Sequence, residues 1–158
     1  MITLGIDPSL NGTGWAILDC KEIKDFGVIR HKANATRLDK FETIVFELNN
    51  ILKKFQPDLI AIEEQHVFFN RASSHVVSEV IGLITGAVIA DPFTTYQFVT
   101  VNMKSARAGV GCKSMKKEDV TRHVRYLFFG GAEDLLDHNE ADAIITGYYA
   151  HCQWQTLA

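Results

Sequence analysis

Apolar residues open the chain in a strand-like pattern, from Leu4 to Asp7, where aliphatic and β-branched side chains prevail. A proline, an asparagine and two glycines within residues 8–14 then predict a turn. Two more short apolar segments, Trp15–Leu18 and Phe26–Ile29, predict two further strands joined by a polar turn at 21–25. These three strands can pair as an antiparallel meander.

From Arg37 to Phe55 the apolar residues recur at helical spacing, and Pro57 ends the predicted helix. Leu59–Ile62 is a short apolar run, typical of a strand covered on both faces. The remaining predicted elements are an apolar helix at Val76–Ala90, a strand at Tyr96–Val101, a short helix or turn at Asn102–Ala108, and helices at Lys116–Phe128 and Leu135–Trp154.

The order of these elements is three strands, a helix, a strand, a helix, a strand and then helices. Strands joined through helices are expected to pair in parallel, so the sequence predicts an α/β fold with a mixed five-stranded sheet that carries helices on its faces. The length of 158 residues predicts a single domain over residues 1–158.

Composition narrows the class of protein. Hydrophobic residues make up 47% and charged residues 22%, and no apolar run is long enough to span a bilayer. Three scattered cysteines outside any Cys-x-x-Cys spacing predict reduced thiols and no zinc site, and no secretion signal is visible, so we expect a cytoplasmic protein. The net charge of −3 argues against nucleic-acid binding unless basic residues are gathered in one patch.

Acidic residues end two of the predicted strands, Asp7 the first and Glu63 the fourth. If those strands are parallel neighbours, the two carboxylates lie side by side and repel unless a cation or a proton lies between them. Asn139 and Asp142 share a face of the last helix, near its start. Such oxygen ligands without thiolates or paired histidines suit Mg²⁺ or Mn²⁺, and two ions could drive phosphodiester hydrolysis. The alternative is that each acid only caps a helix or ends a strand in solvent.

An ordered set of motifs makes the prediction more specific. Gly5-Ile6-Asp7-Pro8-Ser9 with Thr13-Gly14-Trp15-Ala16, then Ala61-Ile62-Glu63, then Glu140-Ala141-Asp142-Ala143 resembles the RuvC family of Holliday junction resolvases. The resemblance covers nearly the whole chain and implies a ribonuclease H-like fold, a homodimer, and Mg²⁺-dependent symmetric nicking of four-way DNA junctions that leaves 5′-phosphate ends. The small size indicates a phage-borne member, which would act in the host cytoplasm.

The resemblance assigns metal ligands at Asp7, Glu63 and Asp142. Glu64 competes with Glu63, because strand alternation lets only one of them face Asp7. Three positions before Asp142 the family has Asp or His, whereas this chain has Asn139. An amide oxygen can bind a hard cation but brings no charge. Either Asp137, His138 or Glu140 compensates, or Asn139 is a substitution that traps an inactive protein.

A basic segment could supply the DNA-binding surface. Lys104 and Lys117 match basic positions that the family uses near the scissile phosphate, and Lys116 is the alternative to Lys117. The remaining residues of the patch, predicted to bind DNA, are Arg107, Lys113, Arg122 and Arg125. An ordinary solvated helix face would have the same composition.

Two aromatic residues, Phe68 and Phe69, follow Glu63 in a predicted loop. If exposed, they could stack on unpaired bases at the centre of a junction, and core packing is the competing interpretation. The apolar segment Val76–Ala90 is the predicted dimer contact, because it is too apolar to remain exposed.

The sequence thus favours an endodeoxyribonuclease that acts on four-way and other branched DNA, with Mg²⁺ as cofactor, Mn²⁺ as a substitute, no small-molecule cofactor and no membrane partner. One alternative is a module that binds branched DNA but cuts it weakly or not at all. Another is an RNA-processing nuclease of the same superfamily. An actin-like phosphotransferase also opens with Gly-x-Asp and a glycine turn, but it needs a longer chain and a second phosphate-binding hairpin.

Overall fold

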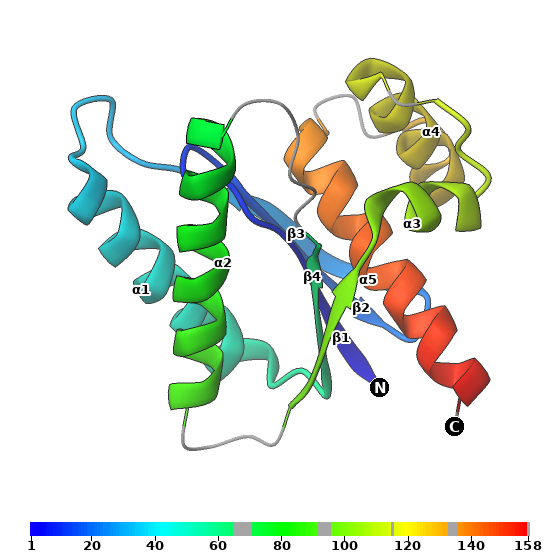
Figure 1. Ribbon diagram of the computed structural model, residues 1–158. Coiled ribbons are helices and arrows are strands. Elements are labelled where there is room, and N and C mark those ends of the chain that lie inside the picture. The colour runs from blue at the N-terminus through cyan, green and yellow to red at the C-terminus, as the bar shows by residue number, and fades with distance from the viewer. Residues whose placement is uncertain (65–70, 92–95, 115, 133–135, 158) are drawn as a thin grey trace.

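A five-stranded sheet lies at the centre of the structure, a computed structural model that describes residues 1–64, 71–91, 96–114, 116–132 and 136–157 (Figure 1). The strand order is β3-β2-β1-β4-β5. β1 pairs antiparallel with β2 and β2 with β3, whereas β1 with β4 and β4 with β5 are parallel. The predicted mixed sheet is therefore confirmed. The strands are β1 (Ile2–Asp7), β2 (Thr13–Asp19), β3 (Glu22–Ile29), β4 (Leu59–Glu63) and β5 (Gln97–Val101).

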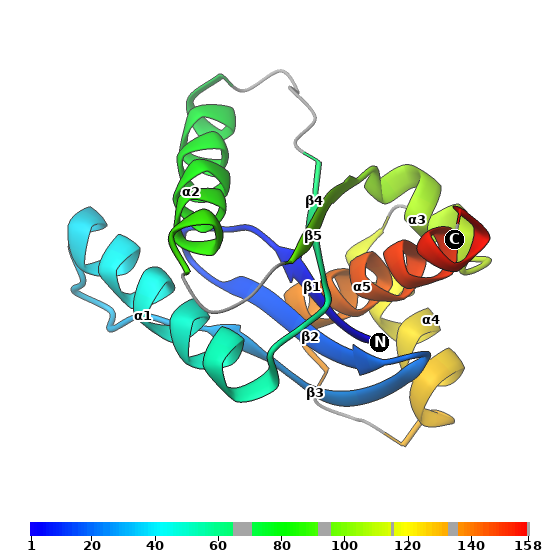
Figure 2. The same ribbon diagram turned by 90° about the horizontal axis from the view of Figure 1, so that it is seen from below.

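Helices cover both faces of this sheet, as the sequence predicted (Figures 1 and 2). One face carries α1 (Arg37–Phe55) and α2 (Arg71–Ala90). The other face carries α3 (Met103–Gly109), α4 (Lys117–Phe129) and α5 (His138–Leu157). Among the described residues, no helix is long and apolar enough to cross a membrane.

Strand alternation divides the core into two clusters, one on each face. Leu4 and Ile6 of β1 pack with α1 and α2, as do Ile60 and Ile62 of β4. The alternate residues Leu59 and Ala61 of β4 pack toward α3, α4 and α5. The odd-numbered positions of β1 and β4 therefore face α5, which decides where the carboxylates at the ends of these strands point.

Several element boundaries differ from the prediction by a few residues, and the largest differences are at the starts of β3 and α2. β3 starts at Glu22, inside the predicted turn, and the chain reverses at Cys20 with a positive φ of 55°. The polar residues at 21–25 indicated a turn, but β3 is an edge strand, on which Glu22 and Lys24 are exposed to solvent. The α2 helix begins at Arg71, five residues before the predicted start.

Backbone contact between α5 and the sheet sets the position of the last helix. A Cβ atom built on Gly5 of β1 would lie 2.2 Å from the carbonyl oxygen of Ala143 and 2.5 Å from the amide nitrogen of Gly147. At Gly14 of β2 it would lie 2.1 Å from the carbonyl oxygen of Asn139. Only glycine permits this approach, so these two strand positions bring the first turns of α5 against the ends of β1 and β2.

We expect Gly5→Ala to lower the free energy of unfolding by about 1–3 kcal/mol, because the added methyl group meets the backbone of α5 and not a flexible side chain. Urea unfolding at low protein concentration measures the change. Asn50→Ala in α1 is the control: Asn50 is exposed in the helix, so the protein should be unchanged or up to about 1 kcal/mol more stable. Equal stability of the Gly5 variant and the wild type would contradict the described packing.

Candidate active site

Asp7 and Glu63 leave the sheet on the same face. Ile6 pairs with Ile62 across the parallel β1–β4 ladder, and the next residue in each strand is the carboxylate. Both have the parity of the positions that face α5. Glu64 has the opposite parity, is exposed, and donates its backbone N–H to the carbonyl oxygen of Val101 at 2.7 Å. The geometry therefore places Glu63, and not Glu64, beside Asp7.

Electrostatic interactions show that three carboxylates act on one another. The pKa of Asp7 is raised well above its usual value, first by burial and then by the negative charges of Glu63 and Asp142. A hydrogen bond with Glu63 raises this pKa further, whereas the positive charge of Lys117 lowers it. Residues from β1, β4, α4 and α5 thus meet at one place.

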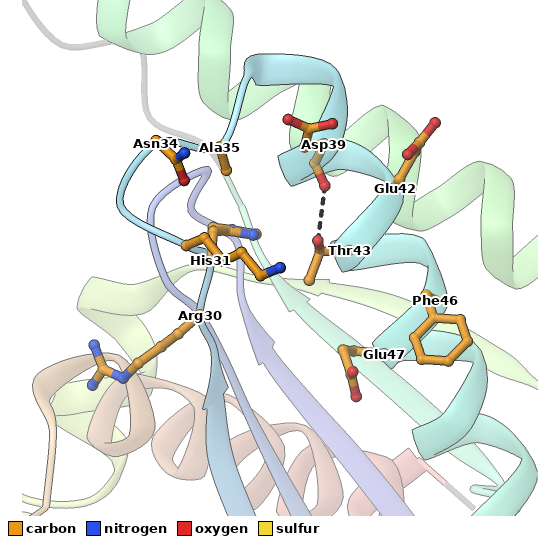
Figure 3. A pocket seen from close by; sticks show the side chains of 10 residues that line it. Arg30, His31, Asn34, Ala35, Asp39, Glu42, Thr43, Phe46 and Glu47 are labelled. Carbon is orange, nitrogen blue, oxygen red and sulfur yellow. Dashed lines mark hydrogen bonds between the residues drawn. The ribbon is translucent and has the colours of Figure 1, made fainter.

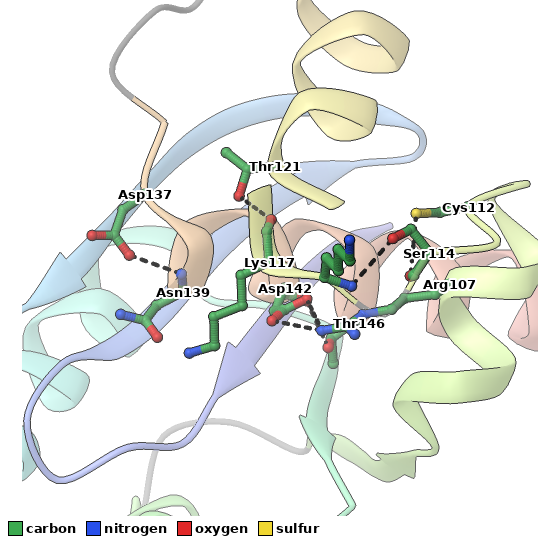
Figure 4. A network of polar contacts seen from close by, with 10 residues as sticks. Arg107, Cys112, Ser114, Lys117, Thr121, Asp137, Asn139, Asp142 and Thr146 are labelled. Atoms are coloured by element: carbon green, nitrogen blue, oxygen red, sulfur yellow. Dashed lines mark hydrogen bonds and ion pairs between the residues drawn. The ribbon is translucent and has the colours of Figure 1, made fainter. Parts of the chain in front are cut away.

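Asp142 is held from a different side. It is 7% exposed, and both of its carboxylate oxygens accept hydrogen bonds from Nη2 of Arg107, at 2.8 and 3.0 Å. Figure 4 shows the guanidinium of Arg107 reaching from α3 to this carboxylate. The arginine, 9% exposed, forms a buried ion pair with the α5 carboxylate. This burial argues against the DNA contact predicted for Arg107.

The other polar residues at the start of α5 have structural contacts. The carboxylate of Asp137 accepts from the backbone N–H of Asn139 at 2.8 Å and forms an ion pair with Arg30 at 2.9 Å. Glu140 accepts from the backbone N–H of Asp137 at 2.8 Å. These bonds satisfy backbone donors at the helix start, as in a capping box. Asp137 and Glu140 are therefore engaged in capping, which argues against their compensating for the neutral Asn139.

The carboxylates of Asp7, Glu63 and Asp142 are oxygen ligands of the kind that hard divalent cations bind. They also repel one another in a partly buried place, which a cation would relieve. As the side chains stand, no three His, Cys, Asp or Glu residues of the described segments are grouped closely enough to hold one ion. The charge of Asp142 acts on Asp7 over a longer distance than metal coordination requires. The oxygens of Asp142 themselves accept hydrogen bonds from Arg107.

The basic residues divide into several environments. Lys117 is the first residue of α4, and its charge acts on Asp7, whereas Lys116 is the exposed N-cap residue before it. Lys104 on α3 and Lys113 in the following loop are exposed. Arg122 is exposed and forms an ion pair with Asp119, and Arg125 is partly buried. Lys117 is thus the lysine that the structure places at the carboxylates.

Figure 3 shows a separate hollow between the end of β3 and α1, with a volume of about 670 Å³. Arg30, His31 and Lys32 line one side, and the acidic residues Asp39, Glu42 and Glu47 line the α1 side. None of the three carboxylates of the candidate site lines it. Its mixed charge does not favour phosphate, so we assign no role to it. Phe68 and Phe69 lie outside the described residues, and their stacking role stays a prediction.

Sequence reasoning missed the ion pair between Arg107 and Asp142, although the helical pattern carries a signal for it. Met103, Ala106 and Arg107 are the buried residues of α3, so the arginine falls on the face that packs against the core. A charged residue on such a face needs an opposite charge. That requirement could have indicated a carboxylate partner, but not which one.

The chain is similar to known proteins over nearly its whole length. Residues 3–146 match the family described as "Crossover junction endodeoxyribonuclease RuvC". A protein of that description from Orientia tsutsugamushi (strain Boryong) is 27% identical over 98% of each chain. One from Caldanaerobacter subterraneus is 29% identical over 80% of this chain and 78% of its own.

Solved structures show the same fold at lower identity. The RuvC protein of T. thermophilus in complex with a Holliday junction substrate superposes with a TM-score of 0.80 at 18% identity, over 98% of this chain and 96% of that one. The fowlpox virus Holliday junction resolvase has a TM-score of 0.58 at 14% identity, over the full length of both chains. The predicted ribonuclease H-like architecture is thus confirmed.

The raised pKa of Asp7 predicts a pH-dependent stability effect without metal. Because the folded protein binds this proton more tightly than the unfolded chain, the stabilisation is complete below about pH 4 and is lost as the pH rises through the folded-state pKa. Asp7→Asn should therefore be more stable than the wild type at pH 7 in EDTA, by about 1.4 kcal/mol for each pKa unit of the elevation. This advantage should shrink toward pH 4.

Thermal unfolding between pH 4 and pH 8 measures the difference. Glu42→Gln is the control, since it removes an exposed carboxylate of α1 away from the site. A wild type that is as stable as Asp7→Asn throughout this range would contradict the raised pKa of Asp7 in the folded protein.

Proposed function

The chain belongs to the RuvC family of crossover junction endodeoxyribonucleases, and from this premise we propose that it resolves four-way DNA junctions by paired, metal-dependent nicking. The observation that carries the proposal is the meeting of Asp7, Glu63 and Asp142 at the ends of β1 and β4 and the start of α5. Other branched DNA would be accepted where it presents the same local geometry.

Divalent-metal dependence is general among nucleases of this family. We assign Mg²⁺, with Mn²⁺ as a substitute, because Asp7, Glu63 and Asp142 offer only oxygen ligands. Asn139 would add a neutral oxygen ligand, so a second ion would bind more weakly. A cation held by these residues would supply an activated water and stabilise the leaving oxygen, and the expected products have 5′-phosphate and 3′-hydroxyl ends.

The chain's own cations act on the phosphate. Lys117, whose charge already acts on Asp7, would stabilise the negative charge of the scissile phosphate. Lys104 is exposed on α3 and would assist it. Lys113, Arg122 and Arg125 would hold the DNA backbone outside the site, with affinity falling as salt rises. The cytoplasmic location and the phage-type origin stay predictions.

A synthetic four-way junction with Mg²⁺ or Mn²⁺ tests the activity. The wild type should nick opposite strands symmetrically, and Asp7→Asn and Asp142→Asn should cut at least about 100-fold more slowly while still binding the junction, because they remove the ligands and not the DNA contacts. Denaturing gels measure cleavage, gel retardation measures binding, and a linear duplex of the same sequence is the substrate control.

The same assay separates the alternatives. Intact DNA under conditions of full binding would favour the binding module, for which the neutral Asn139 is the motivating residue. Faster cleavage of a structured RNA than of the junction would favour the RNA-processing nuclease. Unimpaired cutting by both aspartate variants would show that the reaction occurs elsewhere.

We also propose a homodimer that associates through α2. This helix packs on α1 with Val80, Ile84 and Val88, while Gly82, Gly86 and Ile89 recur at helical spacing on another side. Ile89 is 79% exposed, and a Cβ on either glycine would meet no described atom within 4 Å. A second copy could approach this side closely. Two sites related by a two-fold axis would match the symmetry of a junction.

Ile89→Asp should convert the dimer to a monomer, because a charge would be buried in an apolar contact. Sedimentation equilibrium measures the molecular mass. Leu127→Asp on α4 is the matched control: it also removes an exposed apolar side chain, but on the other face of the sheet, and should leave the dimer intact. A monomeric wild type, or a dimeric Ile89 variant, would contradict the proposed contact.

A further inference from the structure

Arg107 is a buried cation beside a carboxylate that the proposed function assigns to metal. It is 9% exposed and lies on the buried face of α3 with Met103 and Ala106. Burying a guanidinium is unfavourable unless an opposite charge and hydrogen bonds compensate it. Asp142 supplies both, and it comes from a different helix.

The geometry of this pair affects what else Asp142 can bind. One nitrogen of Arg107 donates to both carboxylate oxygens, at 2.8 and 3.0 Å. A carboxylate has about four lone-pair positions, so the guanidinium occupies part of the set that a metal would use. It also cancels the charge that would attract a cation to this ligand.

The two cations near the carboxylates differ in freedom. Lys117 is exposed at the start of α4, and a flexible lysine can turn toward a phosphate. Arg107 is enclosed by the α3–α5 contact, so its charge remains near Asp142. Arg107 is therefore the fixed competitor of a metal at this ligand.

We propose that Arg107 is the resident counter-ion of Asp142, with which a divalent cation competes for the α5 carboxylate. The inference rests on the proposed function, because it takes Asp142 as a ligand. Arg107 acts through Asp142 and is a positioning residue: it keeps the acidic site compact before metal binds, and it weakens metal binding. Metal entry would loosen the ion pair between α3 and α5.

Arg107→Met, which keeps much of the side-chain volume without the charge, should bind Mn²⁺ about tenfold more tightly than the wild type in calorimetry without DNA. Arg107→Lys keeps the charge and should stay closer to the wild type. Arg37→Met is the matched control, since Arg37 is exposed on α1 and pairs with Glu79. The affinity of this variant for Mn²⁺ should equal that of the wild type. Unchanged or weaker binding by Arg107→Met would overturn the inference.

A second measurement holds even if Arg107→Met fails to fold. In the wild type labelled at arginine, the guanidinium NMR signals of Arg107 should report hindered rotation without metal and faster rotation at saturating Mg²⁺. Signals that do not respond to a saturating metal would overturn the inference.

Failure of the inference can be told apart from failure of the proposed site. Asp142→Asn separates them: if it binds Mn²⁺ as well as the wild type, Asp142 is not a ligand and both proposals fall. If it loses binding while Arg107→Met binds no more tightly than the wild type, the metal site stands and only the competition is wrong.

Discussion

Everything in the candidate site depends on how closely α5 lies on β1. Helix and strand meet backbone to backbone at Gly5, where a single methyl group would overlap the carbonyl oxygen of Ala143. This contact places Asp142, one residue before Ala143, within electrostatic reach of Asp7. A side chain at Gly5 would separate the two elements and, with them, the two carboxylates. Gly5 therefore sets the distance between Asp7 and Asp142, although it has no side chain that could take part in the reaction.

That closeness has an electrostatic consequence. Three carboxylates brought to one place repel one another, and other groups of the protein reduce this repulsion. A hydrogen bond joins Asp7 to Glu63, and the positive charge of Lys117 acts on Asp7. Arg107 neutralises the charge of Asp142. The pairing of these charges lets the carboxylates lie together without a metal. In the proposed function, the balance between this internal neutralisation and the remaining negative charge would set the affinity for a metal.

Much of this arrangement could be predicted from strand ends and strand parity. Asp7 and Glu63 each follow an apolar strand, and alternation alone separates Glu63 from Glu64. The extent of β3 could not be predicted, because an edge strand tolerates polar residues that otherwise indicate a turn. The capping contacts of Asp137 and Glu140 are local, and the spacing of an acid and a glutamate three residues apart is that of a capping box. The pairing of Arg107 with Asp142 instead depends on which helices meet in space, and the sequence near either residue does not contain that information.

Alternate residues of β1 and β4 face opposite sides of the sheet, so the candidate site and the apolar core under α1 and α2 lie on different faces. Asp7 and Glu63 lie on the side of α5, and Ile6 and Ile62, one position earlier, lie on the side of α1 and α2. The carboxylates of the candidate site are thus gathered on one face of the sheet, while the other face forms an apolar core with α1 and α2. Because the two faces share only the strands between them, residues of the proposed dimer contact on α2 could change without disturbing the carboxylates. A shift of one residue in the β1–β4 register would undo both at once, since it would turn an acid into the apolar core.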